Sequence, residues 1–143
     1  MNIYLDIDGV LLTDSLSNPG KPSEHSLELL QALTSNHKVL WLTTHCRGGE
    51  NHAPERLYPK FPPEAKEYID KIIPTDWGTW KTDAIDFTQD FRWLDDDVYP
   101  EELNVLANNN ASDKLIHIDL QKNPEQLKEV ILLLKQCPNS LKT

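Results

Sequence analysis

The chain has 143 residues, of which 38% are hydrophobic and 26% charged, and its formal net charge is −9. This length suits a single domain over residues 1–143 with a buried core, and the acidic balance disfavours broad binding to nucleic acid. No apolar stretch is long enough to cross a membrane, and Asp6 and Asp8 interrupt the N-terminal apolar segment, so we expect no signal peptide. Cys46 and Cys137 lie far apart, which predicts a reducing, cytoplasmic location.

The first third of the chain predicts two strands and one helix. Residues 1–7 read as a strand, and a turn-rich segment follows at 17–23. A helix is expected from Glu24, with Ser23 as its N-cap and leucines at helical spacing. Residues 38–42 form a short, nearly continuous apolar run, so both faces of a strand there would be apolar. This is typical of a central parallel strand covered on both faces.

The middle of the chain is more polar. Residues 46–63 contain four prolines, and we expect a surface loop there. Residues 63–70 predict a short helix and residues 71–74 a brief strand. A helix is expected over residues 80–88.

The last third repeats the alternation of strand and helix. Residues 91–94 and 114–118 predict strands, and residues 100–108 predict a helix with proline at its first position. In the final helix Asn123 is the expected N-cap, before Pro124 and a periodic apolar stripe. The pattern predicts an α/β domain with a mainly parallel, five-stranded sheet.

Polar residues follow three of the predicted strands, where ligands bind in parallel sheets. They are Asp6 and Asp8, then Thr43, Thr44 and His45, then Asp95, Asp96 and Asp97, with Lys81 at the start of a helix. Each group has an ordinary explanation when taken alone. Asp8-Gly9 is a turn signal, three aspartates favour the N-terminus of a helix, and a lone lysine is usually a surface residue.

Their coincidence at one edge of the sheet has a stronger implication. Two carboxylates about 4 Å apart repel by ~4 kcal/mol at an effective dielectric constant near 20. Such a group needs a cation or a proton. Carboxylate ligands without histidine or cysteine suit Mg²⁺, and a lysine and a threonine hydroxyl beside it would bind a phosphoryl group.

These residues resemble four motifs of the haloacid dehalogenase (HAD) superfamily of phosphohydrolases, in the same order along nearly the whole chain. "DIDGV" at residues 6–10 is similar to the first motif and "VLWLTT" at 39–44 to the second. Lys81 in "TWKTD" is similar to the third motif and "FRWLDDD" at 91–97 to the fourth. The resemblance implies a three-layer α/β/α Rossmann-like domain.

The resemblance also implies roles for individual residues. Asp6 would be the nucleophile that forms an aspartyl-phosphate, and Asp8 the general acid and base. Thr43 and Lys81 would hold the phosphoryl oxygens. Mg²⁺ would be held by the Asp6 carboxylate, the Asp8 backbone carbonyl and Asp95, with Asp96 as a ligand through water or as a partner of Lys81. Asp97 has no role in the family motif and is expected to cap the following helix.

The intervals between the motifs are too short for a folded cap domain, so the chain resembles capless members of the superfamily. An open site admits large substrates, although some capless members act on small sugar or amino-acid phosphates. A weaker resemblance to HAD domains of RNA-repair proteins makes a polynucleotide 3′-phosphate one candidate substrate. The sequence indicates no membrane partner and no obligate protein partner.

A loop with basic residues follows the second motif. Thr44, His45 and Arg47 are candidates for substrate binding, and the alternative is a loop with scattered charges. Trp77 and Trp80 either stack on a base or pack the loop onto the core, and packing is the commoner role. Cys46 offers a rival thiol nucleophile. His117 and Asp119 end the last strand, where a structural role is expected.

Two hypotheses from different classes follow. The first is a Mg²⁺-dependent phosphatase that acts through Asp6. The second is a non-catalytic phosphate-binding or regulatory module on the same fold, which the intact set of motif residues disfavours.

Overall fold

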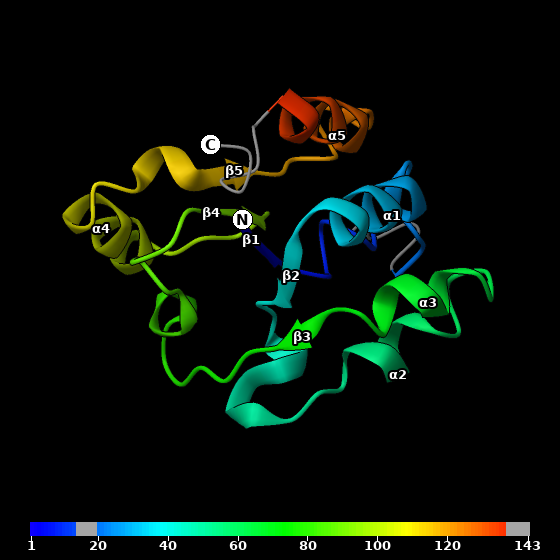
Figure 1. Ribbon diagram of the computed structural model, residues 1–143, viewed down its shortest axis with the longest axis horizontal. Helices are drawn as coiled ribbons and strands as arrows, with labels where there is room; N and C mark the ends of the chain where they lie inside the picture. The colour runs from blue at the N-terminus through cyan, green and yellow to red at the C-terminus, as the bar shows by residue number, and fades with distance from the viewer. Residues whose placement is uncertain (14–19, 137–143) are drawn as a thin grey trace.

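A five-stranded sheet forms the centre of the molecule (Figure 1). The computed structural model describes residues 1–13 and 20–136. Its strands lie in the order β3-β2-β1-β4-β5, and every neighbouring pair is parallel. The predicted α/β fold with a parallel five-stranded sheet is therefore confirmed. The strands are Asn2–Leu5 (β1), Lys38–Trp41 (β2), Ile73–Pro74 (β3), Phe91–Asp95 (β4) and Leu115–His117 (β5).

Strand β1 lies in the middle of the sheet and is buried along its whole length. Its last residue, Leu5, is in register with Trp41 of β2 and with Leu94 of β4. The backbone ladder continues beyond the strand, because the Asp6 N–H donates to the Leu94 carbonyl over 3.1 Å. The residues that follow β1, β2 and β4 therefore emerge next to one another at one edge of the sheet.

Helices cover both faces of the sheet, which gives three layers (Figure 1). Side chains of β1 alternate between the two faces. Ile3 and Leu5 join a core cluster with leucines of α1 and α5, whereas Tyr4 packs in a second cluster with Leu106 of α4. The expected three-layer α/β/α arrangement is confirmed. The helices are Ser26–Asn36 (α1), Ala53–Leu57 (α2), Ala65–Ile69 (α3), Pro100–Asn108 (α4) and Gln126–Gln136 (α5).

The segment 46–63, predicted as a loop, is more ordered than expected. It contains most of the 3-10 segment η1 (Thr44–Gly49) and all of α2. Pro54 lies in the first turn of α2, where its missing N–H costs no hydrogen bond. Ala53 and Leu57 are fully buried in the main core cluster, so apolar burial stabilises this short helix despite the prolines around it.

The helix predicted over residues 80–88 is wrong. Only a four-residue 3-10 turn, η2 (Lys81–Ala84), forms there, and Ile85 is already extended. Threonine, aspartate and isoleucine, all weak helix formers, dominate this stretch. A second 3-10 turn, η3 (Ser112–Lys114), precedes β5.

Two helices begin later than the sequence predicted, so neither expected cap directly precedes its helix. α1 begins at Ser26, after His25 in a left-handed conformation, and the Ser23 hydroxyl instead donates to the buried Val10 carbonyl. At the last helix, the Asn123 side chain accepts a hydrogen bond from the Glu125 N–H at 3.2 Å, but α5 begins only at Gln126, later than expected. Residues 17–19 of the turn expected at 17–23, and Cys137, lie outside the described residues. Among the helices described, none has the length and apolar character needed to cross a bilayer.

Candidate functional site

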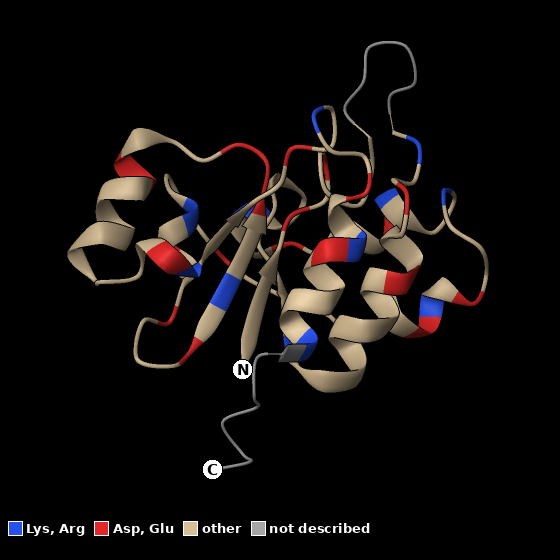
Figure 2. Cartoon of the chain, turned by 90° about the horizontal axis from the view of Figure 1, so that it is seen from above, with Lys and Arg blue, Asp and Glu red and all other residues tan. Residues whose placement is uncertain are grey.

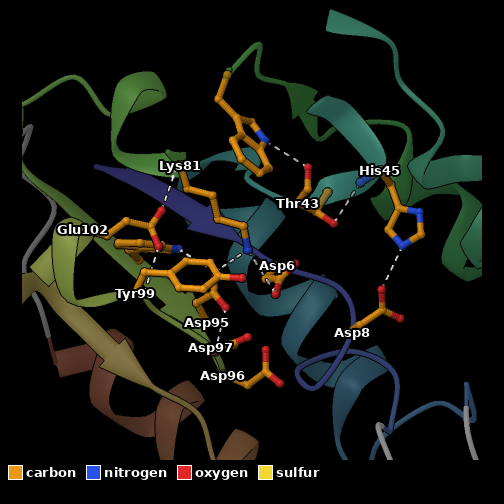
Figure 3. Close-up of polar contacts among 12 residues, drawn as sticks. Asp6, Asp8, Thr43, His45, Lys81, Asp95, Asp96, Asp97, Tyr99 and Glu102 are labelled. Carbon is orange, nitrogen blue, oxygen red and sulfur yellow. Dashed lines mark hydrogen bonds and ion pairs between the residues drawn. The ribbon is translucent and has the colours of Figure 1, made fainter. Parts of the chain in front are cut away.

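Three aspartates meet where β1 and β4 end. Asp6 follows β1, Asp95 ends β4 and Asp96 comes next, and one oxygen from each carboxylate lies within 4.8 Å of the others. Asp6 and Asp95 are buried, and Asp96 is half-buried. Figure 2 shows acidic segments beyond this edge of the sheet, and Figure 3 shows the three side chains together. The structure thus brings these three acids together at one edge of the sheet, as the sequence predicted.

Lys81 lies between two of these carboxylates. Its Nζ is 2.7 Å from Asp95 Oδ2 and 3.4 Å from Asp6 Oδ2, and its side chain is only 11% exposed. The lysine reaches the acids from η2 (Figure 3). The lysine predicted from the third motif is therefore a buried ion-pair partner of the acids, and not the solvated surface lysine of the alternative.

A buried glutamate fixes the backbone that carries Lys81. Glu102 is 1% exposed, and its Oε2 accepts a hydrogen bond from the Lys81 N–H at 2.7 Å. Its Oε1 accepts one from the Tyr99 N–H at 3.0 Å, which caps α4. Sequence reasoning missed Glu102, although a signal was present. Glutamate at the third position of a helix that starts with proline is the capping-box pattern.

Burial of these charges shifts two pKa values. Burial raises the pKa of Asp6 well above its ordinary value, the neighbouring Asp95 carboxylate raises it further, and Lys81 opposes both. Burial lowers the pKa of Lys81, but the pull of Asp6 and Asp95 outweighs burial, and its pKa is raised overall. One lysine does not fully compensate two buried carboxylates with a third beside them. The cluster therefore favours binding of a proton or of a further cation.

The Asp95 carboxylate is held by three donors. Its Oδ2 accepts hydrogen bonds from Lys81 and from the Trp93 indole N–H at 3.2 Å, and its Oδ1 accepts one from the Asp97 N–H at 3.0 Å. The cap predicted for Asp97 is wrong, because Tyr99 is the N-cap residue of α4 and the Asp97 side chain is exposed. Asp97 contributes its backbone N–H to the site.

Gly9 makes room for Asp96. Its φ is +83°, and a Cβ built there would lie 1.9 Å from Asp96 Oδ2. The Gly9 N–H closes the turn after β1 by donating to the Leu12 carbonyl at 2.8 Å. The predicted Asp8-Gly9 turn is present. Its glycine serves both the backbone conformation and the close approach of a site carboxylate.

Asp8 has different surroundings from Asp6. Its side chain is 43% exposed, and its two oxygens lie 2.9 Å from His45 Nε2 and 3.2 Å from Arg56 Nη2. Figure 3 shows the carboxylate turned toward the His45 ring. The structure thus places His45, predicted to bind substrate, against the proposed proton carrier. No sequence signal identified Arg56 as a partner of an acid 48 residues earlier.

The two threonines after β2 have different positions. Thr43 is fully buried, its Oγ1 accepts a hydrogen bond from the His45 N–H at 3.3 Å, and its carbonyl accepts one from Trp77. Thr44 is exposed and lines the pocket described next. Among the residues described, the pocket wall therefore includes Thr44 and not Thr43.

A pocket of about 530 Å³ opens over the acids and Lys81. Trp77 is 6% exposed, donates to the Thr43 carbonyl and belongs to the second core cluster, so the expected packing role is confirmed for it. Trp80 is half-buried, and its ring centroid lies 5.9 Å from that of Tyr99. The lining residues are Asp6, Asp8, Thr44, Arg47, Trp77, Thr79, Trp80, Lys81, Asp96, Asp97, Tyr99, Glu101 and Glu102.

Cys46 is unsuited to nucleophilic attack. The side chain is fully buried, and burial raises the pKa of its thiol to about 11. Its Sγ donates to Asn51 Oδ1 at 3.6 Å. A buried thiol that stays protonated at neutral pH is a structural residue, which disfavours the rival thiol mechanism.

A second pocket, of about 480 Å³, shares Asp96 with the first, and its lining includes His117 and Asp119. His117 Nε2 lies 3.0 Å from the Asp96 carbonyl, and Asp119 Oδ1 accepts a hydrogen bond from the Lys122 N–H. Both residues thus hold neighbouring backbone, in keeping with the structural role expected of them.

Searches against models of protein families, curated proteins and solved structures find no match to this chain. Its function must therefore be inferred from its own residues. The site that they build is a cluster of three carboxylates with one buried lysine, at the end of a parallel sheet and beneath an open pocket.

Proposed function

We propose that the protein is a Mg²⁺-dependent phosphomonoester hydrolase that works through an aspartyl-phosphate on Asp6. One observation carries this proposal. A buried lysine and three clustered carboxylates lie together at the carboxyl ends of parallel strands, and Asp6, Asp96 and Lys81 line a pocket there. The four-motif resemblance to HAD phosphohydrolases assigns the same residues to the same chemistry.

The acid cluster suits magnesium. Its ligand atoms are carboxylate oxygens, which this hard cation prefers, and they are close enough to share one ion. Asp6, Asp95 and Asp96 would hold it, with the Asp8 backbone carbonyl. When bound, Mg²⁺ supplies positive charge that neutralises the transferred phosphoryl group. The raised pKa of Asp6 supports the fit, because burial and then the neighbouring Asp95 carboxylate disfavour its charged form and Lys81 does not offset them.

In the first chemical step, an Asp6 carboxylate oxygen attacks phosphorus and the bond from phosphorus to the ester oxygen breaks. The Asp8 carboxyl gives its proton to the departing alkoxide, which leaves as an alcohol. Asp8 lines the same pocket as Asp6, and its exposure gives it access to both solvent and substrate. In the second step, the Asp8 carboxylate takes a proton from water while the water oxygen attacks phosphorus. Phosphate leaves, and the Asp6 carboxylate is restored.

Lys81 supports the nucleophile. It holds Asp6 in a fixed orientation through their ion pair, and its charge lies where the phosphoryl oxygens would bind. Thr44 and Arg47 line the pocket and are candidates for contacts with the rest of the substrate. Thr43 would act by holding the backbone that carries these two residues.

Two substrate classes are expected from the sequence. One is the phosphorylated end of a polynucleotide or another large molecule, and the other is a small sugar or amino-acid phosphate. Between β1 and β2, and between β2 and η2, the described residues form short helices and turns without an inserted cap domain. We further expect the protein to act in the cytoplasm.

The test is release of phosphate, with and without Mg²⁺, from a 3′-phosphorylated RNA, a 3′-phosphorylated DNA, a phosphopeptide and a panel of sugar phosphates. We expect Mg²⁺-dependent turnover of at least one substrate, and its loss in Asp6→Asn with the fold intact. Retained activity in that variant would contradict the assignment. No turnover of any substrate would favour the alternative, a non-catalytic phosphate-binding module.

A further inference from the structure

Two aromatic side chains form one wall of the pocket. Trp80 and Tyr99 both line it, together with Asp6 and Lys81 on its floor. Their ring centroids are 5.9 Å apart and their planes are inclined by 60°, so each ring supports the other. Tyr99 is 54% exposed, and Trp80 is half-buried. The wall therefore offers aromatic surface to whatever enters the pocket.

The third aromatic residue of the lining, Trp77, is already covered by Arg47. The Arg47 guanidinium carbon lies 5.0 Å from the centre of the Trp77 ring, and Arg47 Nε donates to the Gly78 carbonyl at 2.7 Å. The Trp77 indole N–H is bonded to the Thr43 carbonyl. A planar group that enters the pocket would thus stack on Trp80 and Tyr99, and not on Trp77.

The charges of the pocket limit the number of phosphates. Beyond the acid cluster, the described lining of the pocket contains one cation besides Lys81, which is Arg47. It also contains two exposed acidic residues, Asp97 and Glu101. The chain as a whole carries −9. Binding of a polynucleotide usually depends on several lysine or arginine contacts to successive phosphates. One arginine, in a lining that also contains Asp97 and Glu101, does not provide these contacts.

We propose that Trp80 and Tyr99 bind an aromatic ring on the alcohol portion of the substrate, so that the site accepts small monophosphate esters carrying such a ring. A nucleoside monophosphate and a simple arylmethyl phosphate share this chemistry. The proposal rests on the proposed phosphatase function and selects between its two substrate classes. In a nucleic-acid strand, only the terminal nucleoside would make binding contacts at this site.

The direct test compares two esters of similar size and similar leaving group, benzyl phosphate and cyclohexylmethyl phosphate, which differ in aromaticity. We expect kcat/KM to favour the benzyl ester by about tenfold, within the range measured for a ring stacked on an aromatic side chain. Trp80→Leu and Tyr99→Leu should remove this preference mainly through KM, and Tyr99→Phe should keep it. Leu103→Ala, at an exposed position of α4, is the matched control and should change neither ester.

Equal kcat/KM for the two esters, or equal losses for both in Trp80→Leu, would overturn the proposal. So would a 3′-phosphorylated oligonucleotide that is turned over with a KM more than tenfold below that of the corresponding nucleoside 3′-monophosphate. Adenosine 3′-monophosphate and adenosine 5′-monophosphate, assayed together, distinguish a nucleotide substrate from a simple aromatic ester.

A binding measurement separates this proposal from the function on which it rests. Benzylphosphonate and cyclohexylmethylphosphonate cannot be hydrolysed, and calorimetry with the unaltered protein and Mg²⁺ gives their affinities. A preference for benzylphosphonate without turnover of any ester would support the aromatic site and contradict the phosphatase assignment. Turnover without a preference would contradict the aromatic site alone, and absence of both would contradict both.

Discussion

Asp6 and Asp8 are separated by one residue, yet their surroundings are opposite. The Asp6 side chain is 10% exposed and shares Lys81 with Asp95, whereas the Asp8 side chain is 43% exposed and lies between His45 and Arg56. A nucleophile needs a fixed direction and a local positive charge, while a proton carrier needs access to solvent and to the leaving group. The difference between the two environments therefore matches the difference between the two proposed roles.

Removing the lysine should have the largest effect on this contrast. Lys81→Met leaves two buried carboxylates without their cation, and we expect a loss of ~3 kcal/mol in the free energy of unfolding. Turnover should fall by about 10³-fold, because the charge beside the nucleophile is lost. Urea unfolding and aryl phosphate hydrolysis measure the two effects.

Lys114→Met is the matched control, since Lys114 pairs with the partly exposed Asp90 at 3.1 Å. Exposed pairs contribute less than about 1 kcal/mol, so this variant should change little. Equal destabilisation by the two substitutions would show that the Lys81 cluster is an ordinary surface network.

The second prediction concerns Asp8 and its partners. Asp8→Asn should slow hydrolysis of an alkyl phosphate by about 10²-fold or more, because the alkoxide then leaves without a proton. A dinitrophenyl phosphate, whose leaving group needs no proton, should be much less affected. His45→Gln should show the same dependence on leaving group with a smaller loss, about tenfold, if its contact with Asp8 positions the acid.

His52→Gln is the control for the histidine, because the His52 ring pairs with the exposed Glu50 at 2.6 Å and not with Asp8. A uniform loss for both esters in His45→Gln would mean that His45 acts on folding or substrate binding, and not through Asp8.

The third prediction tests the close approach of Asp96 to the turn after β1. Gly9→Ala would place a methyl group against the Asp96 carboxylate and push it out of position. We expect a loss of Mg²⁺ affinity of about 10- to 100-fold, which is the usual loss when a residue that orients a metal ligand is changed. Gly48→Ala is a close control, since Gly48 has the same φ of +83° with no atom within 4 Å of the added group. Isothermal titration with Mg²⁺ compares them, and similar affinities would remove Asp96 from the metal site.

The smallest expected effect is on stability without metal. Because folding raises the pKa of Asp6, its contribution to stability is fully present below the pKa of an unfolded aspartate and is lost as the pH rises through the folded value. At neutral pH, Asp6→Asn should therefore stabilise the metal-free protein, by about 1 kcal/mol, as is common when a strained active-site residue is replaced. Thermal unfolding from acid to neutral pH should show a smaller pH dependence in the variant. A less stable variant throughout this range would contradict the view that Asp6 is held at a cost.

Local patterns in the sequence predicted several of the strands and helices that carry the site. The continuous apolar run of β2 and the proline at the start of α4 have direct local causes, and both elements form where expected. Asp6 and Asp95 were predictable as neighbours because parallel strands end at one edge of a sheet. The contacts of Asp8 were not, since His45 and Arg56 approach it from a loop and a short helix 37 and 48 residues away. The length of η2 was also missed. Weak helix formers dominate residues 80–88, and the hydrogen bond from the Lys81 N–H to Glu102 that holds the turn joins residues 21 positions apart.

The most direct test of the central claim is to trap the phosphorylated protein. The protein is mixed with ³²P-labelled benzyl phosphate and Mg²⁺, quenched in acid within the first turnovers, and digested so that the labelled peptide is identified. We predict label on the peptide that contains Asp6, dependent on Mg²⁺ and absent from Asp6→Asn, which should also release no phosphate. Turnover by Asp6→Asn at the rate of the unaltered protein, or label on a peptide without Asp6, would contradict the account.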